Sequence, residues 1–137
     1  LESSELDILY DIGLNLGIAF QIQDDYLDLF GEEKIIGKRV GQDVVNNKKT
    51  ALHHLFINTA SKTQLSKYND YISISTDNVK IDKIKSLFIE SDVENSLKKL
   101  IQDYSNNATS DIESLHPKFP KNSNLILLSE LLLKRNY

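Results

Sequence analysis

An acidic cluster lies within an otherwise apolar part of the sequence, FQIQDDYLDLFG, from Phe20 to Gly31. Its aspartates are Asp24, Asp25 and Asp28. Residues four apart share one face of a helix, so Asp24 and Asp28 point the same way, with Asp25 beside them. Like charges at this spacing repel, and a bound divalent cation would remove the repulsion. The pattern predicts a metal site; the alternative is a solvated acidic helix face.

The residue types around the cluster favour magnesium. Carboxylate oxygens with no histidine or thiol nearby suit a hard ion, and Mg²⁺ completes its shell with waters and substrate phosphates. The following loop contains Lys38 and Lys48, and ammonium groups act as point charges for phosphate oxygens. The sequence therefore predicts Mg²⁺ and a phosphorylated substrate, whereas the alternative for the lysines is simple solvation.

The wider pattern resembles a known family. FQIQDDYLDLFG is followed by GKRVGQD and then by NNKKT. In order and spacing these segments resemble the second aspartate-rich region of the trans-type isoprenyl diphosphate synthases, which are all-α polyprenyl synthetases. The resemblance implies an isoprenoid-synthase helical bundle and a transferase that condenses an allylic diphosphate with isopentenyl diphosphate.

The resemblance also implies roles for individual residues. Asp24, Asp25 and Asp28 correspond to metal-binding aspartates, the first as chief ligand of one Mg²⁺ and the others acting mainly through water. Gln21 matches a glutamine of the allylic pocket. The expected catalytic and substrate-binding set, in which Asp43 orders metal-bound water or Lys38, is Gln21, Lys38, Lys48 and Asp43.

Other motifs of that family are absent from the chain. There is no second DDxxD, no arginine pair after one, and no early lysine and arginine region for isopentenyl diphosphate. Residues 1–137 are therefore expected to be the C-terminal part of a single polyprenyl synthetase domain, inactive alone in prenyl transfer. The missing half would leave apolar helix faces uncovered, which predicts a homodimer or other self-association.

The elements that position these residues are predicted to be helices. Apolar residues recur every three or four positions from Ser4 to Phe30, which predicts one long helix ending at a left-handed Gly31 cap. Gly13 and Gly17 lower its intrinsic helicity, so close approach of a neighbouring helix or a ligand is expected there. An ordered loop follows, over residues 31–47, with a turn of helix near its end.

Helical spacing returns in the rest of the chain. A helix is predicted over KKTALHHLFINTASK, a second after a cap at Ser61, and two more on either side of Ser91 and Asp92. HPKFPKN would end the last of these, and NSNLILLSELLLKR would form a final helix. With no alternating strand pattern, the fold class is all-α.

Composition limits the partners. The formal charge is −4, from 20 acidic against 16 basic residues mixed along the chain, which argues against nucleic-acid binding. No run reaches the roughly 18 apolar residues of a membrane span. The absence of cysteine excludes disulfides and thiolate metal sites and suits a reducing cytosol, so a cytoplasmic location is expected.

Two other functions fit the same pattern. The first is a non-catalytic helical subunit that keeps the fold and pairs with a catalytic partner, although such a role would not need the aspartates, Gln21 and both lysines together. The second is a terpene cyclase, which uses similar metal chemistry but carries a second motif of the NSE or DTE type. A first aspartate motif followed by an arginine pair, if present upstream in the parent reading frame, would distinguish the synthase from these two alternatives.

Overall fold

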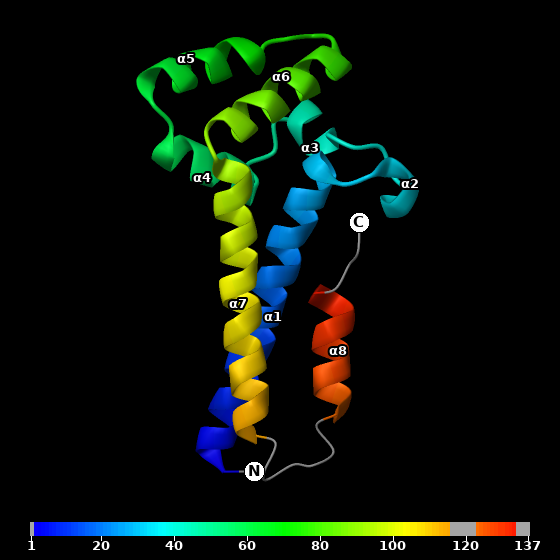
Figure 1. Ribbon diagram of the computed structural model, residues 1–137, viewed down its shortest axis with the longest axis vertical. Helices are drawn as coiled ribbons and strands as arrows, with labels where there is room; N and C mark the ends of the chain where they lie inside the picture. Colours follow the sequence, from blue (N-terminus) through cyan, green and yellow to red (C-terminus); the bar gives the residue numbers. More distant parts are fainter. Residues whose placement is uncertain (1, 116–122, 134–137) are drawn as a thin grey trace. The chain divides into compact units, whose positions relative to one another are not determined.

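The structure is a computed structural model that describes residues 2–115 and 123–133. Every regular element in these ranges is an α-helix, which confirms the all-α prediction. No helix in the described ranges combines the length and apolar character that a membrane span needs. The helices are α1 (Ser3–Phe30), α2 (Glu33–Ile36), α3 (Gln42–Val45), α4 (Ala51–Thr59), α5 (Lys62–Tyr71), α6 (Asp77–Glu90), α7 (Val93–Leu115) and α8 (Ser123–Leu133) (Figure 1).

The chain folds as two compact units. Described residues up to Gln23 and from Lys99 onward form the first unit, and Asp24–Lys98 form the second. Helices α1 and α7 each contribute to both units. The predicted break at HPKFPKN falls at residues 116–122, outside the described ranges.

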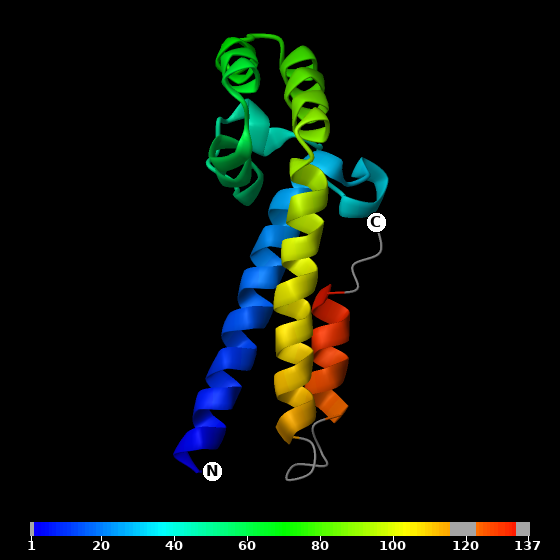
Figure 2. The same ribbon diagram turned by 60° about the vertical axis from the view of Figure 1, so that its left-hand side comes forward.

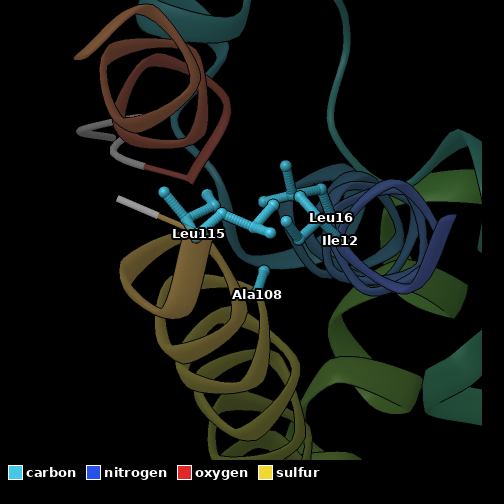
Figure 3. Close-up of a cluster of buried hydrophobic side chains, with 5 residues drawn as sticks. Ile12, Leu16, Ala108 and Leu115 are labelled. Carbon is cyan, nitrogen blue, oxygen red and sulfur yellow. The ribbon is translucent and has the colours of Figure 1, made fainter. Parts of the chain in front are cut away.

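The first unit packs α1, α7 and α8 around one apolar cluster. Its buried residues, most of them labelled in Figure 3, are Ile12 and Leu16 from α1 and Ala108, Ile112 and Leu115 from α7. Leu125 and Ile126 of α8 pack against the cluster. Each fully buried large aliphatic side chain contributes about 1.5–3 kcal/mol, so this cluster is the main stabiliser of the unit.

The helix α1 ends where the sequence predicts, but by a different device. Gly31 is not among the glycines with positive φ, which in the described chain are Gly37 and Gly41. The Gly31 N–H donates to the Leu27 carbonyl as in a continuing helix. Glu32 then takes extended angles and leads directly into α2. The predicted left-handed cap at Gly31 is therefore wrong.

The two glycines inside α1 lie on an open face. In the described chain, apart from the adjoining residues and the local helix backbone, no atom lies within 4 Å of the position that a Cβ would take on Gly13 or Gly17. Of the two predicted neighbours at these glycines, a closely packed helix is absent from the described chain, and a ligand stays a prediction. A groove of about 340 Å³ runs along this face, lined by Gly13, Leu16, Gly17, Phe20, Leu128 and Leu132.

The second unit packs α4, α5 and α6 around aromatic rings. Phe56, Tyr68 and Phe88 come from these three helices, with ring centroids 5.2–6.3 Å apart. Helices α5 and α6 lie side by side in both views (Figures 1 and 2). As predicted, Ser61 caps α5, and it forms a reciprocal capping box with Gln64. These helices form the support for the loop that follows α1.

Candidate functional site

The aspartates of DDYLD lie in the last two turns of α1 and differ in exposure. Asp25 and Asp28 have only 7% and 3% of their surface exposed, whereas Asp24 is half-buried. Burying an ionised carboxylate is unfavourable unless hydrogen bonds or opposite charges compensate. Both buried acids obtain that compensation from the segment that follows α1.

Asp28 holds the turn before α3. Its Oδ2 accepts the Asp43 N–H at 2.9 Å, and its carbonyl oxygen accepts the Gly41 N–H. Gly41 has φ +85°, and a Cβ there would lie 2.7 Å from the Ile81 side chain. Glycine alone avoids both the positive-φ penalty and this clash. The loop can therefore return to the end of α1 because residue 41 has no side chain.

The same carboxyl group has a perturbed acidity. Burial raises the pKa of Asp28 above its ordinary value, and the nearby Asp43 carboxylate acts in the same direction. The hydrogen bond from the Asp43 N–H and the positive charges of Lys38 and Lys48 oppose this rise without cancelling it. Both predicted lysines therefore act on the electrostatics of Asp28.

Asp25 joins α1 to the start of α4. Its Oδ2 accepts the N–H of Ala51, the first residue of α4, at 2.9 Å. The preceding residue, Thr50, caps the same helix by accepting the His53 N–H at 3.2 Å. Two of the N–H groups that a helix start leaves without partners are thus satisfied. Asp25 therefore fixes where α4 begins.

Lys48 lies between two carboxylates. Its Nζ is 3.5 Å from Asp25 Oδ1 and 3.6 Å from Asp43 Oδ2, and half of its side chain is exposed. Partial burial acts to lower the pKa of Lys48, but the Asp43 and Asp25 carboxylates outweigh it and the pKa lies above its ordinary value. This point near the end of α1 therefore favours a positive charge that remains accessible to solvent.

A small cavity lies beside this arrangement. Its volume is about 20 Å³, enough for a single water molecule. The lining includes Asp28, Asp43 and Lys48, and it also includes His53 and Tyr68. The polar end of the site is therefore continuous with the aromatic core of the second unit.

His53 forms the link to that core. It is buried, and its Nδ1 lies 2.9 Å from the Tyr68 hydroxyl. Burial lowers the pKa of His53, and the positive charges of Lys49 and His54 act in the same direction. The neutral imidazole is therefore the favoured form, which suits a structural role.

The structure brings together four of the residues that the sequence singles out. They are Asp25, Asp28, Asp43 and Lys48, joined by the contacts above. Lys38 has an exposed side chain in the turn between α2 and α3. Gln21 lies on α1, three residues before Asp24, with an exposed side chain, and it belongs to the first unit.

Lys80 is a residue of this region that the sequence analysis did not identify. It lies on α6 with only 4% of its surface exposed. Its Nζ donates to Asn47 Oδ1 at 2.7 Å and to the Val45 carbonyl at 3.3 Å. The sequence did contain a signal, because Lys80 precedes Ile84 by four residues and so falls on the buried stripe of α6.

The donor set can be compared with what a metal would require. Within the described part of the chain, no group of three or more histidine, cysteine, aspartate or glutamate side chains is gathered to hold a metal ion. Mg²⁺ commonly uses only one or two protein carboxylates, with waters and phosphate oxygens for the rest. Asp24 is the most accessible of the three aspartates. Among the three aspartates, Asp24 is therefore the carboxylate best placed to act as one of the few protein ligands that Mg²⁺ requires.

Comparison with known proteins identifies the family. The family model described as polyprenyl synthetase matches residues 1–90. The chain is 36% identical over 115 residues to the farnesyl pyrophosphate synthase of Nezara viridula, covering 84% of this chain and 28% of that protein. It is 50% identical over 46 residues to the farnesyl diphosphate synthase of Bacillus subtilis, covering 34% of this chain and 16% of that protein.

A solved structure agrees with these matches. The crystal structure of a geranylgeranyl pyrophosphate synthase superposes with a TM-score of 0.82 at 30% identity, covering all of this chain and 43% of that one. The chain belongs to the polyprenyl synthetase family, and its helical fold is of the isoprenoid synthase type. It spans less than a third of the length of the first curated relatives that it matches.

Proposed function

We propose that residues 1–137 form the C-terminal part of a polyprenyl synthetase domain and supply the second of its two Mg²⁺-diphosphate sites. The placement of Lys48 between Asp25 and Asp43, next to the buried Asp28, carries the proposal. Such an arrangement holds charges in fixed positions before a ligand arrives, which is what stabilisation of a departing anion requires. The parent activity would be prenyl transfer from an allylic diphosphate to isopentenyl diphosphate.

Each residue then has a defined task. Asp24, as the accessible acid, would coordinate Mg²⁺ directly, while Asp25 and Asp28 act mainly through water. When bound, Mg²⁺ would supply positive charge to the diphosphate oxygens. Lys38 and Lys48 would bind oxygens that the metal leaves uncovered.

The remaining assignments concern the substrate pocket and the loop. Gln21 lies within one helical turn of Asp24 on α1 and would contact the allylic substrate. Asp43 orients Lys48 through the ion pair already present. None of these residues has to act as a general acid or base, because the bond to the diphosphate breaks through charge stabilisation.

Calorimetry of the chain with farnesyl diphosphate and Mg²⁺ tests the proposal. We expect binding that depends on Mg²⁺ and that weakens at least about tenfold in Asp24→Ala and in Lys38→Ala. Asp11→Ala and Lys34→Ala are matched controls, because they remove exposed charges from α1 and α2.

The outcomes separate the proposal from its alternatives. Equal losses in the controls and in the site variants would indicate a general charge effect instead of a site. Absence of binding by a chain that is helical by circular dichroism would remove the proposed site from the isolated chain. It would favour a non-catalytic helical subunit.

A further inference from the structure

We propose that Lys80 is a positioning residue that holds Lys48 in place for a diphosphate; the inference builds on the proposed function. The Nζ of Lys80 donates hydrogen bonds to both Val45 and Asn47, the two residues that flank the turn immediately before Lys48. Lys80 itself is too deeply buried to contact a ligand.

The turn before Lys48 depends on an uncommon backbone conformation. Asn47 has φ +52°, a left-handed conformation that asparagine tolerates better than most residues. Its N–H donates to the Val44 carbonyl, and the next N–H, that of Lys48, donates to the Asp43 carbonyl at 2.9 Å. This path brings Lys48 back beside Asp43. A bond to the Asn47 side chain therefore constrains the residue that redirects the chain.

The chemistry of Lys80 indicates a specific role. A buried ammonium is costly, and an apolar residue of similar size at such a position is often as stable or more stable. In the described chain the Lys80 ammonium donates to two neutral oxygens, those of Asn47 and Val45. What the lysine adds, beyond what an apolar residue would provide, is control over the path of residues 45–47.

Helix α6 provides a rigid base for this contact. Ile81, next to Lys80, packs against Gly41 at the start of α3. Asn78 of the same helix accepts a hydrogen bond from Arg39 at 3.1 Å. Asn78, Lys80 and Ile81 of α6 thus contact the loop at both ends of α3. Of these three, Lys80 contacts Asn47, the residue directly before Lys48.

The test uses the full chain with Mg²⁺ and inorganic pyrophosphate as the probe. We expect Lys80→Met and Asn47→Gly each to raise the Kd about tenfold, since glycine keeps the left-handed turn but removes the Oδ1 acceptor. Lys83→Met, an exposed lysine on the same helix, should bind like the unmodified chain. In a Lys48→Met background, Lys80→Met should change the Kd by less than about twofold.

A second measurement does not require the ligand. Exchange of the Lys48 amide hydrogen should quicken about tenfold in both Lys80→Met and Asn47→Gly but not in Lys83→Met, because local opening of the turn becomes easier. Unchanged exchange in both variants, or an equal loss of binding with and without Lys48, would overturn the positioning role. If Lys80→Met fails to fold, Asn47→Gly decides by the same two readouts.

The two proposals fail in different ways. If the unmodified chain does not bind pyrophosphate, the proposed function is lost for this chain. Exchange of the Lys48 amide then decides alone whether Lys80 positions Lys48. If binding is present but insensitive to Lys80→Met and Asn47→Gly, the site stands and the positioning role is rejected.

Discussion

Gly41 is the single residue on which the return of the loop to α1 depends most directly. Its φ is +85°, and a Cβ would lie 2.7 Å from Ile81, which is itself buried. We expect Gly41→Ala to lower the free energy of unfolding by about 2–4 kcal/mol, from the strained φ and the overlap together. Urea denaturation followed by circular dichroism measures this loss.

Gly37 provides the matched control for that substitution. It also has positive φ, +74°, but among the described residues, its chain neighbours aside, no atom lies within 4 Å of its Cβ position. Gly37→Ala should therefore cost only the conformational part, about 1 kcal/mol. Equal losses in the two variants would show that packing against Ile81 contributes nothing.

His53 gives the protein a dependence on pH. Burial lowers the pKa of His53 in the folded state, so below its ordinary pKa the unfolded chain binds a proton more readily. The contribution of His53 to the free energy of unfolding is therefore constant above pH of about 6.5. It falls as the pH drops below this value, by at most about 1.4 kcal/mol per pH unit.

The dependence can be assigned by substitution. His53→Gln should flatten the decline of stability below pH of about 6.5 in denaturation curves, whereas His54→Gln, at an exposed neighbour, should leave it in place. His53→Gln should also lower stability at neutral pH, because the Tyr68 hydroxyl loses its partner. An unaltered slope in His53→Gln would assign the dependence to other groups.

At the scale of elements, Asp25 connects the end of α1 to the start of α4. Removing the carboxylate leaves the Ala51 N–H without its acceptor and Lys48 without one of its two carboxylates. We expect Asp25→Ala to lower the free energy of unfolding by about 1–3 kcal/mol. Asp7→Ala, at an exposed position of the same helix, should change it by less than about 0.5 kcal/mol.

The local signals in the sequence predicted the long helices well, but they missed the short helix α2 and predicted the contacts between helices poorly. Apolar spacing predicts α1 to within a residue, and Ser61 caps α5 as expected, because both depend on neighbours in the chain. The acidic cluster was also recognised as unusual. Its hydrogen-bond partners, Asp43 and Ala51, could not be predicted, because they depend on the path of residues 31–50.

Residues that act at a distance were missed for the same reason. Gly31 is of the residue type that usually forms a left-handed helix cap. The position that requires glycine is instead residue 41, because of its positive φ and its closeness to Ile81. Lys80 falls on the apolar stripe of α6, yet its role depends on a turn more than thirty residues away in sequence. Periodicity identifies which positions are buried and leaves open what a buried polar group contacts.

At the scale of the whole molecule, the first unit exposes apolar side chains that favour association. Tyr10 on α1 and Leu131 on α8 are 71% and 67% exposed, and Leu6, Leu14, Leu127 and Leu128 are each about half exposed. Clustered exposed apolar residues mark interaction surfaces. We expect sedimentation velocity to show a concentration-dependent dimer or larger species at micromolar protein.

Charged substitutions test which surface is responsible. Tyr10→Lys and Leu131→Lys should shift the chain toward the monomer, while Ile57→Lys, at a 42% exposed site of the second unit, should not. A chain that remains monomeric at all concentrations would contradict the expectation. Association that persists in all three variants would exclude these two side chains as its cause.

The proposed function also predicts what the chain does not do alone. The chain contains one DDxxD and no arginine pair after it, so under the proposed function it would supply only one of two aspartate-rich regions. We expect no prenyl transfer from farnesyl diphosphate to radiolabelled isopentenyl diphosphate. Mixing the chain with the part of the Nezara viridula farnesyl pyrophosphate synthase that lies outside the matched stretch should produce transfer if that part supplies the other region.

The site residues make that reconstitution informative. Asp24→Ala or Lys48→Ala should lower the rate of the mixture at least about a hundredfold, because both groups act on the charge that develops on the diphosphate. Lys34→Ala should leave the rate unchanged, since it is an exposed lysine of α2. Transfer by the chain alone would contradict the expected inactivity. A mixture that Asp24→Ala does not slow would mean that catalytic charge stabilisation does not depend on Asp24.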